Sequence, residues 1–83
     1  MLVEMTMYPL GETHVGKDLA EIMQTVNDSN LPYRLTPTGT CIEGEWDEVM
    51  ALVKKCHERM RRHSSHVVTG ITVEDEEGAT NKL

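Results

Sequence analysis

The sequence predicts an α+β sandwich in which two helices cover one face of a four-stranded antiparallel sheet. Three observations predict it. The hydrophobic pattern switches between strand and helix periods in the order β-α-β-β-α-β, a Pro-Thr-Gly turn separates the two middle strands, and 83 residues suffice for one domain only. Because crossover connections are right-handed, both helices are expected on the same face.

The first strand and the first helix are expected in the N-terminal part of the chain. Within residues 2–8 the side chains alternate, with Val3, Met5 and Met7 on one side and Glu4, Thr6 and Tyr8 on the other. This is the period of a half-buried strand, and Pro9 and Gly11 end it. From about residue 15 the period becomes that of an amphipathic helix, which Pro32 stops. Its apolar stripe consists of Val15, Leu19, Ile22, Met23 and Val26.

The rest of the chain predicts a hairpin, a second helix and a last strand. Tyr33–Thr36 and Thr40–Glu43 form the hairpin around the Pro37–Gly39 turn. Helical spacing follows over residues 46–62, and His66–Glu74 is rich in the Val, Ile and Thr that strands favour. The complete order is that of the ferredoxin-like βαββαβ sandwich.

Size and composition suggest how this fold is organised. Residues 1–83 are interpreted as a single domain, and residues 75–83 lack any hydrophobic period and are expected to form a mobile tail. A domain of this size buries only about 60% of the surface that its unfolded chain exposes, so self-association is an efficient way to bury more. We therefore expect a homo-oligomer.

Alternation also divides the predicted sheet into a covered and an uncovered face. The side chains expected to face the helices are Val3, Met5, Met7, Leu35, Ile42, Ile71 and Val73. Those expected on the uncovered face are Glu4, Thr6, Tyr8, Arg34, Thr36, Cys41, Glu43, Val68, Gly70 and Thr72. The first and third strands are central in this fold, so Glu4 and Glu43 should lie on neighbouring strands. Such carboxylates either form a solvated or subunit-buried surface with Arg34 as counter-ion, or accept hydrogen bonds from an amine-bearing ligand.

Charge and composition narrow the function classes. Fourteen acidic against eight basic residues give a formal net charge of -6, which argues against nucleic-acid binding. The N-terminus lacks the features of a signal peptide, and no apolar run approaches the ~20 residues of a membrane span, so we expect a cytoplasmic protein that makes no membrane contact. Cys41 and Cys56 are then expected to be free thiols.

No pattern in the sequence indicates catalysis or a metal site. Cys56 and His57 are adjacent on the second helix and point about 100° apart, so they cannot share a proton transfer. His63 and His66 lack a third metal ligand nearby in sequence. Trp46, at the start of the same helix, is expected to anchor packing rather than to stack on a ligand. We therefore expect neither an enzyme nor a protein that depends on a metal or cofactor.

Three stretches of the sequence resemble a known family, namely Met5–Gly11, Tyr33–Met50 and Val67–Thr69. The middle stretch contains the segment G-T-x-I-E-G-x-W-D-E-V, which chance explains poorly. On these residues the chain is similar, over residues 2–74, to the small YkoF-like thiamine-binding protein family, long catalogued as a family of unknown function. The resemblance implies a ferredoxin-like fold, a homotetramer built as a dimer of dimers by sheet-to-sheet packing, and binding of thiamine or its hydroxymethylpyrimidine part without catalysis.

The resemblance and the predicted geometry together suggest where such a ligand binds, namely on the open sheet face at a subunit interface. The matching positions that could reach it are Glu4, Thr6, Tyr8, Thr36, Thr38, Thr40 and Glu43. The flat aminopyrimidine would stack near Tyr8, and Glu4 or Glu43 would accept a hydrogen bond from its amine or ring nitrogen. The same acidic pair would balance the positive charge of the thiazolium ring.

Two other interpretations stay open. The same element order suits a regulatory module resembling an ACT domain, which binds an amino-acid effector at a subunit interface, and Arg34 beside Glu43 would then hold the two charged ends of the effector. The other interpretation is a purely structural oligomer whose open face only holds subunits together.

Overall fold

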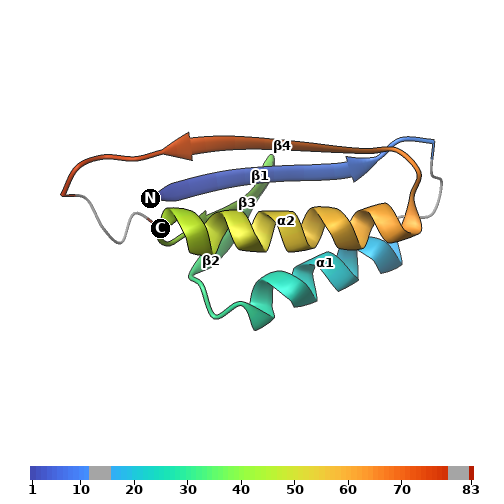
Figure 1. Ribbon diagram of the computed structural model, residues 1–83, viewed down its shortest axis with the longest axis horizontal. Helices are drawn as coiled ribbons and strands as arrows, with labels where there is room; N and C mark the ends of the chain where they lie inside the picture. The colour runs from blue at the N-terminus through green and yellow to red at the C-terminus, as the bar shows by residue number, and fades with distance from the viewer. Residues whose placement is uncertain (12–15, 79–82) are drawn as a thin grey trace.

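The computed structural model describes residues 1–11, 16–78 and 83, and it has the predicted order of elements (Figure 1). The elements are β1 (Leu2–Pro9), α1 (Gly16–Asp28), β2 (Tyr33–Thr36), β3 (Gly39–Glu43), α2 (Trp46–His63) and β4 (Val67–Glu74). The sheet order is β2-β3-β1-β4, every pair is antiparallel, and both helices lie on one face. The predicted ferredoxin-like fold is confirmed.

Element boundaries differ little from those predicted. β4 begins at Val67 rather than at His66, and β3 begins one residue early, at Gly39. α1 ends where Asn30 adopts a φ of 64°, a left-handed conformation that Asn tolerates and that stops a helix. Val15 of the predicted apolar stripe and residues 79–82 of the predicted tail lie outside the described residues. None of the described helices is long and apolar enough to cross a membrane.

The sheet register confirms which side chains share a face. Val3 lies opposite Ile42 on β3 and Val73 on β4, whereas Glu4 lies opposite Cys41 and Thr72. Directly opposed residues point to the same face of a sheet. Val3 and Ile42 are fully buried beneath the helices, so Glu4 and its row lie on the open face.

The core lies between the two central strands and the two helices. Its fully buried side chains are Val3, Val26, Ile42, Val49, Cys56 and Met60. α2 contributes the last three because its apolar residues recur at helical spacing. Cys56 is a free thiol in this core, and burial raises its pKa to about 11, so the thiol stays neutral and inert. Cys41 is also a free thiol.

An ion-pair cluster joins the two helices at their outer side. The Glu21 carboxylate on α1 lies 2.8 Å from the His63 imidazole and 3.4 Å from the Arg59 guanidinium, both on α2. The hydrogen bond from His63, followed by the charge and hydrogen bond of Arg59, lowers the pKa of Glu21. The cluster therefore favours the ionised carboxylate.

Three side chains predicted to face the helices do so without being buried, and one packing prediction, that for Trp46, is wrong. Leu35, Ile71 and Val73 do belong to the helix side of the sheet, but they are 61%, 44% and 37% exposed. The reason is that β2 and β4 are the edge strands, and two helices cover only the centre of the sheet. Trp46, expected to anchor packing, is more than half exposed at the start of α2.

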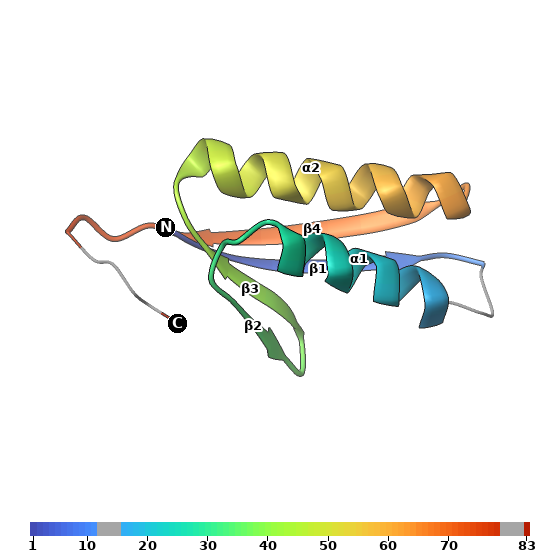
Figure 2. The ribbon, with the colours of Figure 1, turned by 90° about the horizontal axis from the view of Figure 1, so that it is seen from below.

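β1 has two neighbours along its first half and one along its second. It pairs with β4 from Leu2 to Pro9, but with β3 only from Leu2 to Met5. Figure 2 shows the β2–β3 hairpin running obliquely away from β1 toward its turn. Gly39, at that turn, approaches β1 so closely that a Cβ there would lie 2.5 Å from the Met5 carbonyl oxygen. Within the part of the chain that the structure describes, no strand pairs with Thr6–Pro9 on the side where β3 would continue, and we call this segment the bare part of β1.

Candidate functional site

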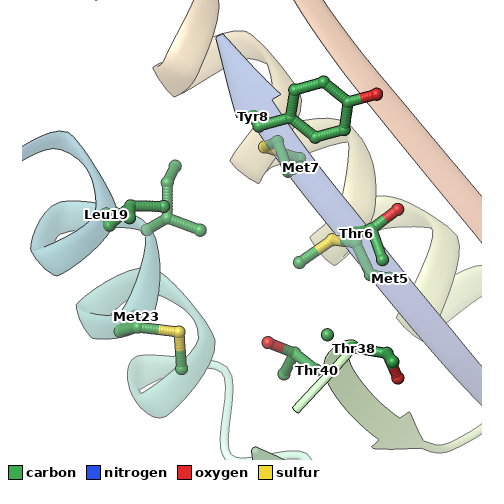
Figure 3. A pocket seen from close by; sticks show the side chains of 10 residues that line it. Met5, Thr6, Met7, Tyr8, Leu19, Met23, Thr38 and Thr40 are labelled. Carbon is green, nitrogen blue, oxygen red and sulfur yellow. The ribbon is translucent and has the colours of Figure 1, made fainter. Parts of the chain in front are cut away.

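A cavity of about 290 Å³ lies at the bare part of β1, between that strand, α1 and the hairpin turn. Figure 3 shows Leu19 and Met23 on α1 facing the side chains of β1, with Thr38 and Thr40 at one end. The residues that line it are Met5, Thr6, Met7, Tyr8, Leu19, Ile22, Met23, Thr38, Gly39 and Thr40. Its walls therefore combine thioether, aliphatic and hydroxyl groups with one aromatic ring.

The cavity reaches both faces of the sheet because no strand closes the edge of β1 there. Met5 and Met7 belong to the helix side, whereas Thr6 and Tyr8 alternate with them and belong to the open side. Tyr8 is 48% exposed, so its side chain is accessible to a ligand. Thr40 lies opposite Met5 on the helix side and is only 7% exposed.

Four of the seven residues predicted to reach a ligand line this cavity, namely Thr6, Tyr8, Thr38 and Thr40. Thr36 does not, because its hydroxyl is used within the hairpin turn. That oxygen accepts hydrogen bonds from the backbone N–H groups of Gly39 at 3.1 Å and Thr38 at 3.3 Å, and it donates to the Gly39 carbonyl at 3.0 Å. Thr36 thus holds the turn that carries Thr38 to the cavity.

Glu4 stands beside the cavity rather than in it. Its carboxylate accepts a hydrogen bond from the Thr38 hydroxyl at 3.2 Å and a weaker one from the Cys41 thiol at 3.9 Å. Burial raises the pKa of Cys41, and the neighbouring Glu4 charge raises it further, so the thiol remains a donor. Glu4 is therefore linked to the cavity wall through Thr38.

Glu4 also lines a second hollow, on the open face of the sheet. This hollow has a volume of about 210 Å³ and lies among Leu2, Glu4, Cys41, Thr72 and Glu74. Glu43 lies opposite Leu2, on the same face as predicted, but it lines neither of the two hollows. The predicted acidic pair therefore shares a face without sharing a cavity.

Sequence reasoning missed the α1 side of the cavity and the edge of β1. Met5, Met7, Leu19, Ile22 and Met23 follow the period of buried residues and were assigned to the core for that reason. A signal was present in the strand lengths: β1 has eight residues and β3 has five, so part of β1 had to lack its central partner. Among the described residues, no three His, Cys, Asp or Glu side chains gather as metal ligands.

Curated relatives support a family assignment. A UPF0045 protein of Synechocystis sp. is 39% identical over 59 residues, which cover 70% of this chain and 49% of that protein. A UPF0045 protein of Mycobacterium bovis is 34% identical over 85 residues, covering all of this chain and 83% of that protein. Matches with the Synechocystis protein and with a UPF0045 protein of Eremothecium gossypii thus span only about half of those proteins, 49% and 56%.

Solved structures have the same fold. A protein of Methanocaldococcus jannaschii described as hypothetical superposes with a TM-score of 0.88 at 22% identity, covering 99% of this chain and 86% of that one. A Thermotoga maritima protein, provisionally described as a thiamine biosynthesis or salvage protein, superposes with a TM-score of 0.85 at 18% identity, covering 98% and 88%. At these identities the likeness concerns the fold alone.

The model of one protein family matches nearly the whole sequence. It covers residues 3–83, which include every strand and helix described above except for the first residue of β1. The resemblance noted in the sequence is confirmed by this match and by the UPF0045 relatives. The chain belongs to the family of thiamine-binding proteins.

Proposed function

We propose that this chain is a non-catalytic binding protein for thiamine or its hydroxymethylpyrimidine part, and that the cavity at the bare part of β1 holds the pyrimidine ring. The observation that carries the proposal is the convergence of Thr6, Tyr8, Thr38 and Thr40 on one cavity, beside a carboxylate. The sequence alone predicts all four as ligand-binding residues. Family membership supports the class of ligand.

The size and lining of the cavity suit a single aromatic ring. Its volume of about 290 Å³ is at the lower end of the range for small-molecule sites, about 300–1,000 Å³. Three methionine thioethers line it, and sulfur makes favourable contacts with aromatic rings. Tyr8 offers a ring for stacking, and three threonine hydroxyls offer hydrogen bonds. The pyrimidine would occupy the cavity, and the thiazolium ring of thiamine would extend out of it.

Charge favours a cationic ligand. The chain has a formal net charge of -6, and Glu4 stands at the cavity wall next to Thr38. A carboxylate within several ångströms of the thiazolium ring would offset the cost of removing that charge from water. Among the described residues that line the cavity, none has a carboxylate, imidazole or thiol, and Tyr8 alone has a titratable side chain. This composition supports binding rather than acid–base or nucleophilic catalysis.

Assembly and location form part of the same proposal. In a homotetramer formed as a dimer of dimers by sheet packing, a second copy would cover the open face on which Thr6 and Tyr8 lie. That cover would complete the site at a subunit interface. The two free thiols suit the reducing cytosol, where we expect the protein to act.

One row of residues favours a second candidate, an ACT-like module for an amino-acid effector. Arg34, Cys41 and Glu4 lie opposite one another across β2, β3 and β1 on the open face. A guanidinium and a carboxylate in one row could hold the two charged ends of an amino acid. This candidate would bind on the open face, beside the hollow that Glu4 and Cys41 line, instead of in the cavity at β1.

A thermal-shift and calorimetric titration tests the proposed function. Thiamine and hydroxymethylpyrimidine at about 100 times Kd should stabilise the protein by about 2.7 kcal/mol, or about 10 °C or more for a domain of this size. A plate of amino acids should give no shift. A native mass spectrum of the same sample reports the subunit count and any retained ligand.

Two matched threonine variants separate the two hollows. Thr40→Val removes a hydroxyl from the cavity at β1, and Thr72→Val removes one from the open-face hollow. Each change preserves side-chain shape, so we expect Thr40→Val to weaken pyrimidine binding several-fold and Thr72→Val to leave it unchanged. The reverse ranking would place the pyrimidine in the open-face hollow, whereas a response to amino acids alone would favour the ACT-like candidate.

A further inference from the structure

The backbone N–H and C=O groups of successive β1 residues point alternately toward β4 and toward β3. The Leu10 N–H donates to the His66 carbonyl at 2.8 Å, which extends the β1–β4 register, and the Gly44 N–H donates to the Met1 carbonyl at 3.0 Å, which extends the β1–β3 register. In an antiparallel ladder, the residues bonded to one neighbour alternate with those bonded to the other. The even-numbered residues of β1 therefore bond to β4, and the odd-numbered ones face the β3 side.

Met7 is the odd-numbered residue that this pattern leaves without a strand opposite it. The pairing of β1 with β3 ends at Met5 and Thr40, and the hairpin then turns away. The N–H and C=O of Met7 consequently face the cavity that Met7 itself lines. Pro9 is the next odd-numbered residue of β1, and as a proline it has no backbone N–H. Met7 is thus the one residue of the bare segment Thr6–Pro9 that offers a donor and an acceptor together.

We propose that the Met7 backbone N–H and C=O recognise the ring nitrogen and the adjacent amine of the pyrimidine. The inference rests on the proposed function and names the group that gives it specificity. The ring nitrogen accepts a hydrogen bond and the amine donates one, which complements an N–H beside a C=O. Backbone groups held in a strand lose no rotamer freedom on binding, so they form a preorganised site.

The same arrangement explains how the ring is enclosed. A ring bonded edge-on to β1 extends the plane of the sheet into the cavity. Its one face is then directed toward Leu19 and Met23 on α1, and its other face toward the open side, where Tyr8 lies (Figure 3). Side chains supply contact area, whereas the strand edge supplies the hydrogen bonds.

The edge suits a single ring better than an added peptide strand. Strand addition needs a run of donors and acceptors at alternate residues. Here one such residue is available, because Met5 is already paired with Thr40 and Pro9 lacks a donor. The hairpin turn with Gly39 and Thr38 closes one end of the bare segment. A small heterocycle with a neighbouring acceptor and donor is therefore the occupant that the geometry favours.

Calorimetric titration with two ligands and two variants tests the inference. The ligands are hydroxymethylpyrimidine and its deaminated analogue, in which an oxo group replaces the amine and a ring N–H replaces the acceptor nitrogen. The variants are Met7→Pro, which removes the N–H without breaking a bond to a neighbouring strand, and Met7→Leu, which keeps it. The wild type and Met7→Leu should prefer the amino compound by about tenfold or more, because a hydrogen-bonding site rejects an analogue that mismatches it. Met7→Pro should lose about tenfold in affinity for the amino compound.

The outcomes distinguish failure of the proposed function from failure of the inference about the Met7 backbone. If the wild type binds neither pyrimidine nor thiamine, the proposed function itself is wrong. If it binds hydroxymethylpyrimidine but Met7→Pro binds as tightly as Met7→Leu, or the oxo analogue binds equally well, the backbone inference is overturned and the proposed function stands. Hydrogen exchange on the wild type provides a measurement that needs no variant. Hydroxymethylpyrimidine should slow exchange of the Met7 amide, and an unchanged rate in a saturated complex would also overturn the inference.

Discussion

The two halves of β1 have the same length, alternation and extended backbone, yet they have different neighbours. Residues Leu2–Met5 lie between β3 and β4, with Val3 fully buried beneath the helices. Residues Thr6–Pro9 pair only with β4 and line a cavity. The first half satisfies its backbone within the sheet, and the second leaves one residue to be satisfied by something else.

This difference shows how one strand can serve both stability and binding. The cause is the early turn of the hairpin at Gly39, which ends β3 while β1 continues. Side chains on the bare part of β1 still alternate as in a core strand, but β3 does not pair with the backbone there. A site built in this way is rigid because β4 holds it on the other side.

The largest expected effect is a difference in how much a substitution in each half of β1 lowers the free energy of unfolding. Val3→Ala should lower the free energy of unfolding by about 2 kcal/mol, because it removes two buried methyl groups and leaves a cavity in the core. Tyr8→Ala, on the half-exposed second half, should change it by less than about 1 kcal/mol but weaken pyrimidine binding. Urea denaturation and calorimetry of the two variants measure both quantities. Equal losses of stability would show that the halves are not distinct.

A second comparison tests the close approach that ends the pairing of β1 with β3. Gly39→Ala should lower the free energy of unfolding by about 1–2 kcal/mol and disturb pyrimidine binding, because its Cβ would meet the backbone of Met5. Gly16→Ala is the matched control, since a Cβ at that first residue of α1 has no atom within 4 Å. Alanine favours helices, so the control should be neutral or stabilising by about 0.5 kcal/mol. A Gly39→Ala variant as stable as the control would mean that the hairpin does not press on β1.

The smallest expected effect tests whether stability can change without any change in binding. The folded state lowers the pKa of Glu21 through His63 and Arg59, so this carboxylate stabilises the fold above its unfolded pKa, near 4.5. That contribution is lost as the pH falls through the lower folded pKa. Glu21→Gln should therefore show a slightly smaller fall in urea midpoint than the wild type between pH 6 and about pH 3, with pyrimidine affinity at pH 7 unchanged. A steeper fall in the variant would contradict the assigned direction of the shift.

The sequence allowed the element order and the register to be predicted, because both follow from periods that side chains impose locally. The placement of Glu4 on the open face is an example, since alternation over residues 3–8 puts it on the side opposite Val3 and Met5. Leu35 and Ile71 show the limit of that reasoning. Alternation assigns them correctly to the helix side, but whether a helix reaches them depends on their strands lying at the sheet edges.

The candidate site was predicted only in part for a related reason. Alternation along the first strand predicts Thr6 and Tyr8, the place around the hairpin predicts Thr38 and Thr40, and all four line the cavity. The α1 wall and the Met7 backbone were not identified. Leu19 and Met23 have the same period as buried residues, and a free backbone edge has no signature in side-chain composition. Such features follow from how far two strands pair, which is a property of the tertiary structure.

The measurement that tests the central claim most directly is a map of amide chemical-shift changes on titration with hydroxymethylpyrimidine. The two halves of β1 predict different responses within one strand. The amides of Thr6, Met7 and Tyr8 should shift strongly together with those of Leu19 and Met23, while that of Val3 should hardly move. Shifts centred instead on Cys41 and Thr72, across the open face, would contradict the account.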